Sequence, residues 1–401
     1  MNRTQTLVVS APRGSGGAYT HLSRVLPRVM RLLPDWRIEV HGSEETFHAC
    51  FGGVGESWMK PLPGAGYRAR LRWEFVDLPR RLRADREALL WAPFGPPLNV
   101  RLAPRSVWIS QNLLPLLRPK ELQLSGGDRL RIRALQVLFV QWARHARRTI
   151  CISRHARHRL ETLAGAAPGS FPVIPHGVDP VSPAIRCSSD SLEKLRATRY
   201  LLYAGQPVPY RRTLELCRAF AILTERRKDA PPLVVLGKSR AADREYEAAC
   251  LDALGPLLRA GRATVLGQAS HADTLALMGS AHAFVYPSVH EDCPNVVLEA
   301  LSAGRVGVYA DIPAVRELAA DAGLFLNDPQ PEALATALER AVFDPIERAR
   351  VADAARARAA LFDWNRAAEQ TANVLKEAAG CAVRRDDGRA RTTLPAQMKS
   401  Q

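Results

Sequence analysis

Short apolar runs of strand type alternate with helical patterns along almost the whole chain. The predicted strands are residues 6–12, 37–42, 88–93, 106–111, 149–153, 200–205, 232–238, 263–268, 283–288 and 306–310. Between them apolar residues recur at helical spacing, as at Leu22, Val25, Leu26 and Val29. Parallel strands need a crossover, usually a helix, so this alternation predicts an α/β fold with parallel sheets.

A polar, periodless stretch around residues 180–199 separates two such α/β units. The predicted boundaries are an N-terminal domain at 1–182, a linker at 183–198, a C-terminal domain at 199–360, a helix at 361–380 that packs back on the N-terminal domain, and a disordered tail at 381–401. Ligands bind outside the carboxyl ends of parallel strands, so two such domains predict a functional cleft between them.

The positive charge of the chain belongs to its first half. Residues 1–200 hold 31 Lys and Arg against 15 Asp and Glu, whereas residues 201–401 hold 25 of each. This asymmetry predicts an anionic partner for the first half. Residues 66–87 and 128–148 mix arginine with apolar and aromatic residues. We expect the first segment to contact an anionic membrane surface, and the apolar centre of the second to be core.

Other sequence features limit the class of protein. No apolar run approaches the ~20 residues of a membrane span, and the N-terminus lacks a signal-peptide pattern. Seven irregularly spaced cysteines indicate a reducing compartment, so the expected location is the cytoplasm, including the inner face of its membrane. No metal-ligand spacing occurs, and no metal or cofactor is expected. The sequence pI of about 10.1 raises nucleic-acid binding as a rival, but no nucleic-acid-binding motif supports it.

The stretch HEDCPNVVLEA, residues 290–300, carries two glutamates eight positions apart. Pro294 suits the start of a helix that ends before Gly304, so Glu291 precedes the helix and Glu299 lies within it. The free N–H groups at Asn295 and Val296 then form an anion site, and the two carboxylates flank it. The alternative is an acidic helix start that complements the helix dipole, with Glu299 in solvent. The residues alone leave both interpretations open.

Two further stretches follow predicted strands. Arg211 and Arg212 come after the strand that ends at Gly205, and adjacent arginines there can clamp a diphosphate. The glycine-rich loop 13–17, with Gly16 and Gly17, follows the first strand. It lacks the P-loop lysine pattern and GxGxxG, so a tight turn explains it equally well.

Taken together these stretches resemble the glycosyltransferase family 4 group, whose members have the GT-B fold of two Rossmann-like domains. The resemblance covers residues 6–378 and is strongest in SAHAFVYPSVHEDCPNVVLEALSAG and the following DIPAVRELAADAGLFLNDPQPEALATAL. Looser matches are the GSGG loop, SQNLLP, CISRHAR and VIPHGVDP.

The resemblance implies roles for individual residues. Glu299 would hold the ribose of a nucleotide sugar and Glu291 would lie beside the donor sugar. The diphosphate would lie between Arg211 and the helix start at Pro294, Asn295 and Val296. Lys238 and Gly205 would border the donor pocket, and Arg212 would assist Arg211. The acceptor side of the cleft would include Gly16, Gly17, Gln111, Asn112, Ser153 and Arg154. Many members have His-Asp where this chain has Gln111-Asn112, so the family's histidine role is not assigned to either of these two residues.

The implied function is metal-independent retaining transfer of a sugar, of hexosyltransferase type, from a nucleotide-diphosphate sugar to a hydroxyl acceptor. The acceptor would be a glycan or a lipid-linked molecule in the assembly of cell-surface polysaccharide, lipopolysaccharide or glycolipid. A sugar phosphorylase of the same fold and a basic nucleic-acid-binding protein are the alternatives. The base, the sugar and the acceptor are not readable from the residues.

Overall fold

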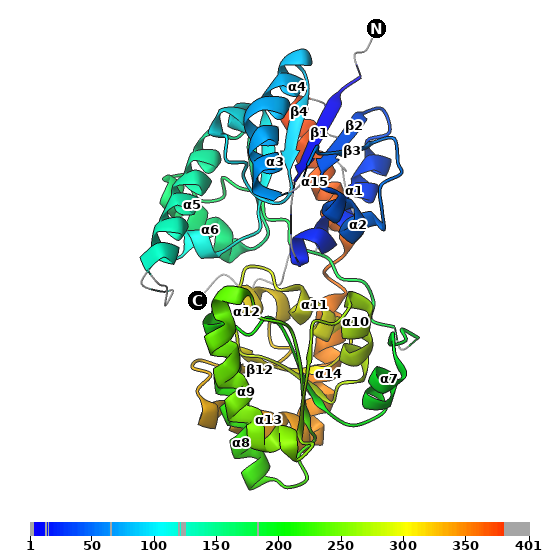
Figure 1. The fold of residues 1–401 in the computed structure, drawn as a ribbon, viewed down its shortest axis with the longest axis vertical. Coiled ribbons are helices and arrows are strands. Elements are labelled where there is room, and N and C mark those ends of the chain that lie inside the picture. Colours follow the sequence, from blue (N-terminus) through cyan, green and yellow to red (C-terminus); the bar gives the residue numbers. More distant parts are fainter. Residues whose placement is uncertain are drawn as a thin grey trace.

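Two α/β domains, each built on a six-stranded parallel sheet, make up the chain (Figure 1). The computed structural model describes residues 4–12, 14, 16–64, 66–118, 121, 126–182 and 184–380. The predicted tail at 381–401 lies outside the described residues. In Figure 1 the N-terminal domain, blue to cyan, lies above the C-terminal domain, green to orange.

The N-terminal sheet has the strand order β3-β2-β1-β4-β5-β6, with every pairing parallel. Its strands are β1 (Thr6–Ala11), β2 (Arg37–Gly42), β3 (Met59–Pro61), β4 (Leu89–Ala92), β5 (Ser106–Ser110) and β6 (Arg148–Cys151). Its helices are α1 (Gly17–Leu32), α2 (Glu44–Phe51), α3 (Gly66–Arg72), α4 (Leu78–Ala84), α5 (Gly126–His145) and α6 (Arg154–Ala164). Strands β1, β4 and β5 are buried along their whole length, which explains their apolar runs.

The C-terminal sheet has the order β12-β11-β10-β7-β8-β9, again fully parallel. Its strands are β7 (Leu201–Ala204), β8 (Leu233–Leu236), β9 (Ala263–Gly267), β10 (Ala283–Tyr286), β11 (Val306–Ala310) and β12 (Leu324–Leu326). Its helices are α8 (Thr213–Arg226), α9 (Arg244–Arg259), α10 (His271–Ser280), α11 (Asn295–Ser302), α12 (Pro313–Ala319), α13 (Pro331–Phe343) and α14 (Pro345–Ala359).

Both sheets therefore have the same Rossmann topology. In each sheet the chain starts in the middle, builds three strands to one side and then three to the other. The order reverses between β1 and β4 in one domain and between β7 and β10 in the other. Such switch points open a crevice at the carboxyl ends of the strands, where ligands bind in folds of this type. The prediction of two Rossmann-like domains is confirmed.

The C-terminal helix α15 (Trp364–Ala379) leaves the second domain and packs against α1 (Figure 1). Trp364, Leu375 and Ala378 are among its buried residues. The chain passes between the domains twice, once after Val178 and once near Phe362. Val178 donates its N–H to the carbonyl of Phe362 at 3.0 Å, so these two connecting segments lie side by side.

Several elements differ from the sequence expectation. The strands β3 and β12 and the helix α2 were not predicted; both strands are only three residues long and give little periodic signal. The predicted helix at 361–380 begins at Trp364 as α15, and a separate helix, α14, precedes it, with residues 360–363 between the two. The predicted linker contains a short helix, α7 (Asp190–Arg196), which Ser189 caps by accepting the N–H of Leu192.

Candidate active site

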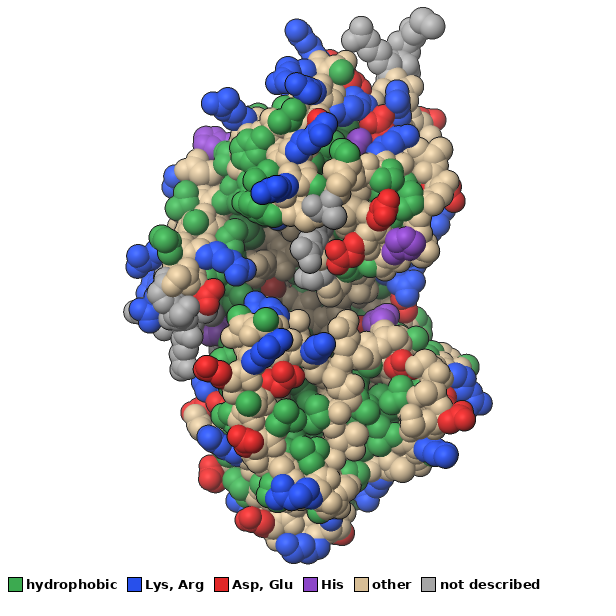
Figure 2. Space-filling view, viewed as in Figure 1, with side chains coloured by type: hydrophobic (Ala, Val, Ile, Leu, Met, Phe, Trp, Pro, Cys, Tyr) green, Lys and Arg blue, Asp and Glu red, His purple; other side chains and the backbone are tan. Residues whose placement is uncertain are grey.

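A cleft of about 1680 Å³ lies between the two domains at the switch points of both sheets. Figure 2 shows it as the hollow between the upper and lower parts of the molecule. Loops after β1 and β4 contribute to it from the N-terminal domain, and loops after β7, β8 and β10 from the C-terminal domain. Most of the predicted site residues line it: Gly16, Gly17, Gln111, Asn112, Gly205, Arg211, Lys238, Glu291, Pro294, Asn295, Val296 and Glu299.

Glu291 is fixed at the edge of the cleft by three donors to one oxygen. The hydroxyls of Tyr286 and Ser288 donate to its Oε1 at 2.6 and 2.9 Å, and Arg211 Nε donates to the same atom at 3.2 Å. Tyr286 ends β10 and Ser288 follows it, so the strand positions the carboxylate that comes after it. The side chain of Glu291 is 13% exposed. A carboxylate held in this way keeps one orientation toward the cleft.

Arg211 comes from the loop after β7 and is enclosed by aromatic rings. Its guanidinium carbon lies 5.7 Å from the ring centre of Tyr210 and 5.9 Å from that of Tyr286. With Glu291 as its ion-pair partner, the guanidinium is a fixed positive charge on the wall of the cleft. A permanently charged planar group suits recognition of a diphosphate.

Arg212 does not share this position. It adopts a left-handed backbone conformation with φ of 52°, and its Nη1 donates to Glu215 Oε1 at 2.8 Å at the start of α8. It is not among the residues that line the cleft. The structure therefore gives no support to the catalytic role predicted for Arg212, because adjacent residues in a turn project in different directions.

The start of α11 faces the start of α1 across the cleft. Pro294 precedes the first helical residue, Asn295, and this helix start lines the cleft with residues whose N–H groups have no partner within the helix. A Cβ atom on Gly17 would lie 3.2 Å from Asn295 Nδ2, so the glycine loop and the Asn295 amide are neighbours. Two helix N-termini, one from each domain, thus converge on one region, which favours an anion there.

His176 positions the Asn295 side chain. Its Nδ1 lies 2.6 Å from Asn295 Oδ1, which can only accept, so Nδ1 is the donor and the amide nitrogen faces Gly17. His176 is buried against His21 and Trp364, with ring centres 5.1 and 5.7 Å away. Burial lowers the pKa of His176 to about 4, against the opposing effect of the Asn295 hydrogen bond. The ring is therefore neutral near pH 7.

Glu299 lies one helical turn deeper in α11 and is buried except where it lines the cleft. Its Oε1 is 3.8 Å from His271 Nδ1. Burial, and then the charge of Asp179, raise the pKa of Glu299 to about 7. A buried carboxylate facing a cavity can accept hydrogen bonds from ligand hydroxyls, which would replace the water it has lost.

Glycines allow β7 and β8 to end close together beside the cleft. Gly237 has a φ of 133°, and a Cβ there would overlap the carbonyl oxygen of Gly205. A Cβ on Gly205 would itself press on Tyr203 and Tyr286. The backbone at these two positions therefore forms part of the cleft floor, and Lys238 follows directly.

The predicted acceptor residues divide into two groups. Gln111 and Asn112 line the cleft, where Gln111 Nε2 donates to the carbonyl of Pro93 at 2.6 Å and Asn112 Oδ1 accepts from Leu114 N–H at 3.1 Å. Ser153 and Arg154 do not line it. They join the domains instead: Ser153 Oγ donates to Asp292 Oδ1 at 2.6 Å, and the Arg154 N–H donates to Glu317 at 2.7 Å.

The sequence interpretation missed several residues that complete the site. Tyr286 and Ser288 hold Glu291, His176 holds Asn295, and Asp292 bonds Ser153 across the domain boundary. Burial raises the pKa of Asp292 to about 7, with the nearby Glu317 and Glu291 adding to the effect and the Ser153 hydrogen bond opposing it. A signal existed for Tyr286 and Ser288, since both stand at the carboxyl end of a predicted strand just before Glu291.

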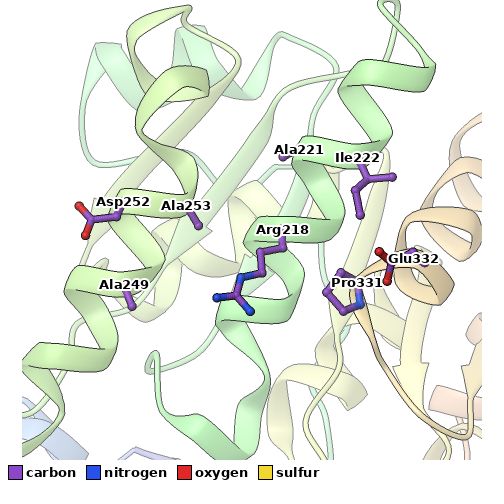
Figure 3. A pocket seen from close by; sticks show the side chains of 8 residues that line it. All are labelled: Arg218, Ala221, Ile222, Ala249, Asp252, Ala253, Pro331 and Glu332. Atoms are coloured by element: carbon purple, nitrogen blue, oxygen red, sulfur yellow. The ribbon is translucent and has the colours of Figure 1, made fainter.

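A second hollow, of about 740 Å³, lies on the outer surface of the C-terminal domain between α8, α9 and the start of α13 (Figure 3). Arg218, Asp252 and Glu332 contribute its charged groups. None of the predicted site residues lines it among those described. Across the described part of the chain, no group of three His, Cys, Asp or Glu could hold a metal ion. No helix within that part has the length and apolarity to cross a bilayer.

Comparison with known proteins agrees with this geometry. Residues 188–358 match the family model of "Glycosyl transferases group 1". The O-antigen chain mannosyltransferase B of Escherichia coli is 28% identical over 181 residues, which are 44% of this chain and 45% of that protein. A D-inositol 3-phosphate glycosyltransferase of Nocardiopsis dassonvillei is 26% identical over 276 residues, 66% of this chain and 64% of that protein. The alignments thus span about half to two thirds of these relatives.

Two solved structures have the same fold over almost the whole chain. The lipopolysaccharide glycosyltransferase WaaG superposes with a TM-score of 0.69 at 17% identity, covering 92% of this chain and 99% of that one. Anabaena Alr3699/HepE, solved in complex with UDP and glucose, gives 0.67 at 17% identity, covering 94% and 100%. The chain therefore has the GT-B fold, and its residues 188–358 are similar to the glycosyl transferases group 1 family.

Proposed function

We propose that the protein is a retaining glycosyltransferase of family 4 that moves a sugar from a nucleotide-diphosphate sugar to a hydroxyl acceptor. The observation that carries the proposal is the Arg211–Glu291 pair, which faces the N-termini of α11 and α1 in one cleft. A fixed cation and two helix N-termini suit a diphosphate, and the adjacent carboxylates Glu291 and Glu299 suit sugar hydroxyls. HepE, which has this fold, was solved with UDP-glucose.

In the proposed reaction the bond between the donor sugar C1 and the diphosphate oxygen breaks, and its electron pair leaves with the diphosphate. Arg211 and the N–H groups at Asn295 and Val296 stabilise that developing charge in place of a metal. The acceptor oxygen bonds C1 from the face that the diphosphate leaves, and its proton passes to a phosphate oxygen. Glu291 lies beside the oxocarbenium-like sugar, and Glu299 binds the ribose.

The proposed setting is the assembly of cell-surface polysaccharide, lipopolysaccharide or glycolipid at the cytoplasmic face of a membrane. The names of the mannosyltransferase and WaaG relatives support the glycan setting. The arginine-rich α3–α4 segment, with the exposed side chains Tyr67, Phe75 and Val76, supports contact with an anionic membrane. The acceptor is a glycan or a lipid-linked molecule.

A nucleotide screen tests the donor. We expect UDP, GDP or ADP to raise the thermal unfolding temperature, and the matching nucleotide sugar to be hydrolysed slowly without acceptor. Stabilisation by inorganic phosphate alone would instead support a sugar phosphorylase, and stabilisation by DNA alone would support nucleic-acid binding.

Two neighbouring arginines provide a matched mutational test of the leaving-group role. Arg211→Ala should lower kcat roughly 10²–10³-fold, as loss of a preorganised charge at a transition state does. Arg212→Ala should change kcat little, because Arg212 pairs with Glu215 away from the cleft. Equal rates for wild type and Arg211→Ala would refute the role of Arg211.

A further inference from the structure

The two sides of the cleft differ in chemical character. The side formed by α1, α11 and the loops after β7 and β8 presents glycines, amides and charged groups. The side formed by the loops after β4 and β5 and by α5 carries Gln111, Asn112 and Arg131 and is otherwise largely apolar. This apolar wall consists of Phe94, Leu98, Leu113, Leu135, Leu138 and Phe139.

Helix α5 contributes the largest part of the apolar wall. Leu135, Leu138 and Phe139 are spaced as one face of a helix, and all three line the cleft. Leu135 and Leu138 are partly buried and pack on the core around Trp108 and Trp142. Their inner sides are thus held by the domain, while their outer sides face the cavity.

Arginines stand beside this wall. Arg131 precedes Leu135 by one helical turn and lines the same cleft. Its side chain is 67% exposed, and its ion pair with Asp128 spans 4.0 Å. Arg70, from α3, also lines the cleft. Arg70 Nε donates to Oε1 of the buried Glu74 at 2.7 Å, so this side of the cleft combines a hydrocarbon surface with two arginines that each have a neighbouring carboxylate.

Exposed apolar side chains also occur on the elements that border the cleft. Tyr67 on α3 lines the cleft and is 65% exposed, and Leu130 and Val137, on the solvent side of α5, are 71% and 61% exposed. In Figure 2 hydrophobic side chains border the hollow on the N-terminal-domain side. Clusters of exposed apolar groups at the edge of a cavity are uncommon on soluble surfaces and mark binding sites.

These features discriminate between classes of acceptor. A soluble sugar or oligosaccharide would place hydroxyl groups against leucine side chains, where they lose water and gain no partner. A hydrocarbon chain gains from the same surface, since the free energy of burial follows the apolar area removed from water. Guanidinium groups match phosphate oxygens in geometry and charge.

We propose that the acceptor is an amphiphile, in which a hydroxyl-bearing head is joined through a phosphate or diphosphate to a hydrocarbon chain. The chain lies along the apolar wall at Leu135, Leu138 and Phe139, and the phosphate lies at Arg131 and Arg70. The head then points to the cleft side that holds Glu291. That this ligand is the acceptor rests on the proposed glycosyltransferase function, whereas its binding does not.

Calorimetric titration with farnesyl diphosphate, a short anionic isoprenoid, tests the site. We expect it to bind about tenfold more tightly than inorganic pyrophosphate, which lacks the chain, and than farnesol, which lacks the phosphates. We also expect it to bind when the nucleoside diphosphate found in the thermal screen is saturating. If no nucleotide binds but farnesyl diphosphate does, the proposed function fails while this site stands.

Three variants locate the binding. Leu138→Gln and Arg131→Gln should each weaken farnesyl diphosphate binding about five- to tenfold. Leu130→Gln is the matched control on the same helix, since this side chain is exposed and does not line the cleft. Arg131→Gln removes an exposed side chain, so it remains a fair test if Leu138→Gln lowers stability.

Three results would overturn the proposal. They are equal affinity for pyrophosphate and farnesyl diphosphate, one-for-one competition between farnesyl diphosphate and the nucleotide, and tighter binding of a soluble oligosaccharide than of farnesyl diphosphate. The first two would assign the isoprenoid to the donor phosphate site, and the third would make the acceptor a free glycan.

Discussion

At the scale of single residues, the site depends on side chains that hold other side chains. Glu291 keeps its orientation through Tyr286, Ser288 and Arg211. Asn295 keeps its orientation through His176, which comes from the last segment of the N-terminal domain. A sequence motif identifies the groups that face a ligand more readily than their supports, because the supports come from separate parts of the chain.

His176 should affect nucleotide binding without contacting the nucleotide. His176→Phe keeps a ring beside His21 and Trp364 but cannot donate to Asn295 Oδ1. Loss of a neutral hydrogen bond of about 1 kcal/mol should weaken nucleoside diphosphate binding roughly fivefold. The expected change is in the dissociation constant and KM, with kcat nearly preserved. An unchanged dissociation constant would mean that Asn295 needs no such support.

Glu299 should make nucleotide binding depend on pH. Its pKa of about 7 in the free protein means that the carboxyl ionises between pH 6 and 8, and burial disfavours that ionised form. Its contribution to folding stability is therefore lost as pH rises through about 7. Ribose hydroxyls bond better to the carboxylate, so nucleoside diphosphate affinity should rise about three- to tenfold from pH 6 to pH 8.

Glu299→Gln is the control for this pH dependence. It removes the titrating group, while ionisation of the nucleotide phosphates continues and affects both proteins equally. Asp292 is a second carboxyl with a pKa of about 7; it lies before α11 and accepts a hydrogen bond from Ser153. The variant Asp292→Asn distinguishes its effect on the pH dependence from that of Glu299. If wild type and Glu299→Gln show the same pH dependence, the ribose role of Glu299 is wrong.

At the scale of elements, helix α15 is part of the N-terminal domain although it is the last described helix of the chain. Trp364 is 2% exposed and contacts His21 on α1, with ring centres 6.2 Å apart. A Cβ on Gly177 would overlap the backbone of Trp364, so the two segments that connect the domains are in direct contact. The helix thus packs on the domain that carries the apolar wall of the cleft.

Trp364→Ala should therefore destabilise the N-terminal domain. Removing a buried tryptophan costs about 3–5 kcal/mol of unfolding free energy, which should appear as a lower transition temperature in calorimetry. Arg366→Ala, an exposed position on the same helix, should leave the transition unchanged. Equal transition temperatures for Trp364→Ala and wild type would show that α15 does not support the fold.

At the scale of the whole molecule, charge divides between the halves of the chain. Residues 1–200 hold 31 basic residues against 15 acidic ones, and Lys and Arg side chains are prominent over the upper domain in Figure 2. The proposed acceptor site lies in the same half, beside α3 and α5. An anionic lipid surface would meet both the charge and the apolar wall.

Vesicle binding tests the membrane proposal. The protein should bind vesicles that contain phosphatidylglycerol at low salt and be released at high salt. Arg68, Arg72 and Arg80 are exposed, and replacing all three by Gln should weaken binding at least about tenfold, since each charge is worth ~1 kcal/mol near such a surface. Replacing Arg226, Arg244 and Arg259, exposed on the C-terminal domain, should have little effect. Equal loss in both triple variants would indicate non-specific attraction.

The sequence by itself determined the two parallel sheets and most of the cleft lining. Buried parallel strands are continuous apolar runs, and ligand-facing loops follow them directly, so periodicity locates both. Glu291, Arg211 and Glu299, which the sequence singles out, line the cleft, and their roles there stay predictions. Three-residue strands such as β3 and β12 carry too few positions for a period, and they were missed.

Only the tertiary structure decided which side chains meet across the chain. Arg211 and Arg212 are adjacent residues of the same type. The backbone conformation of the turn nevertheless directs the Arg211 side chain to Glu291 and the Arg212 side chain to Glu215. Ser153 and Arg154 proved to join the domains rather than to line the cleft. His176 and Asn295 are 119 positions apart and bond at 2.6 Å. The physical reason is that periodicity reports which face of an element is buried, whereas a long-range contact depends on where the fold places two separate segments.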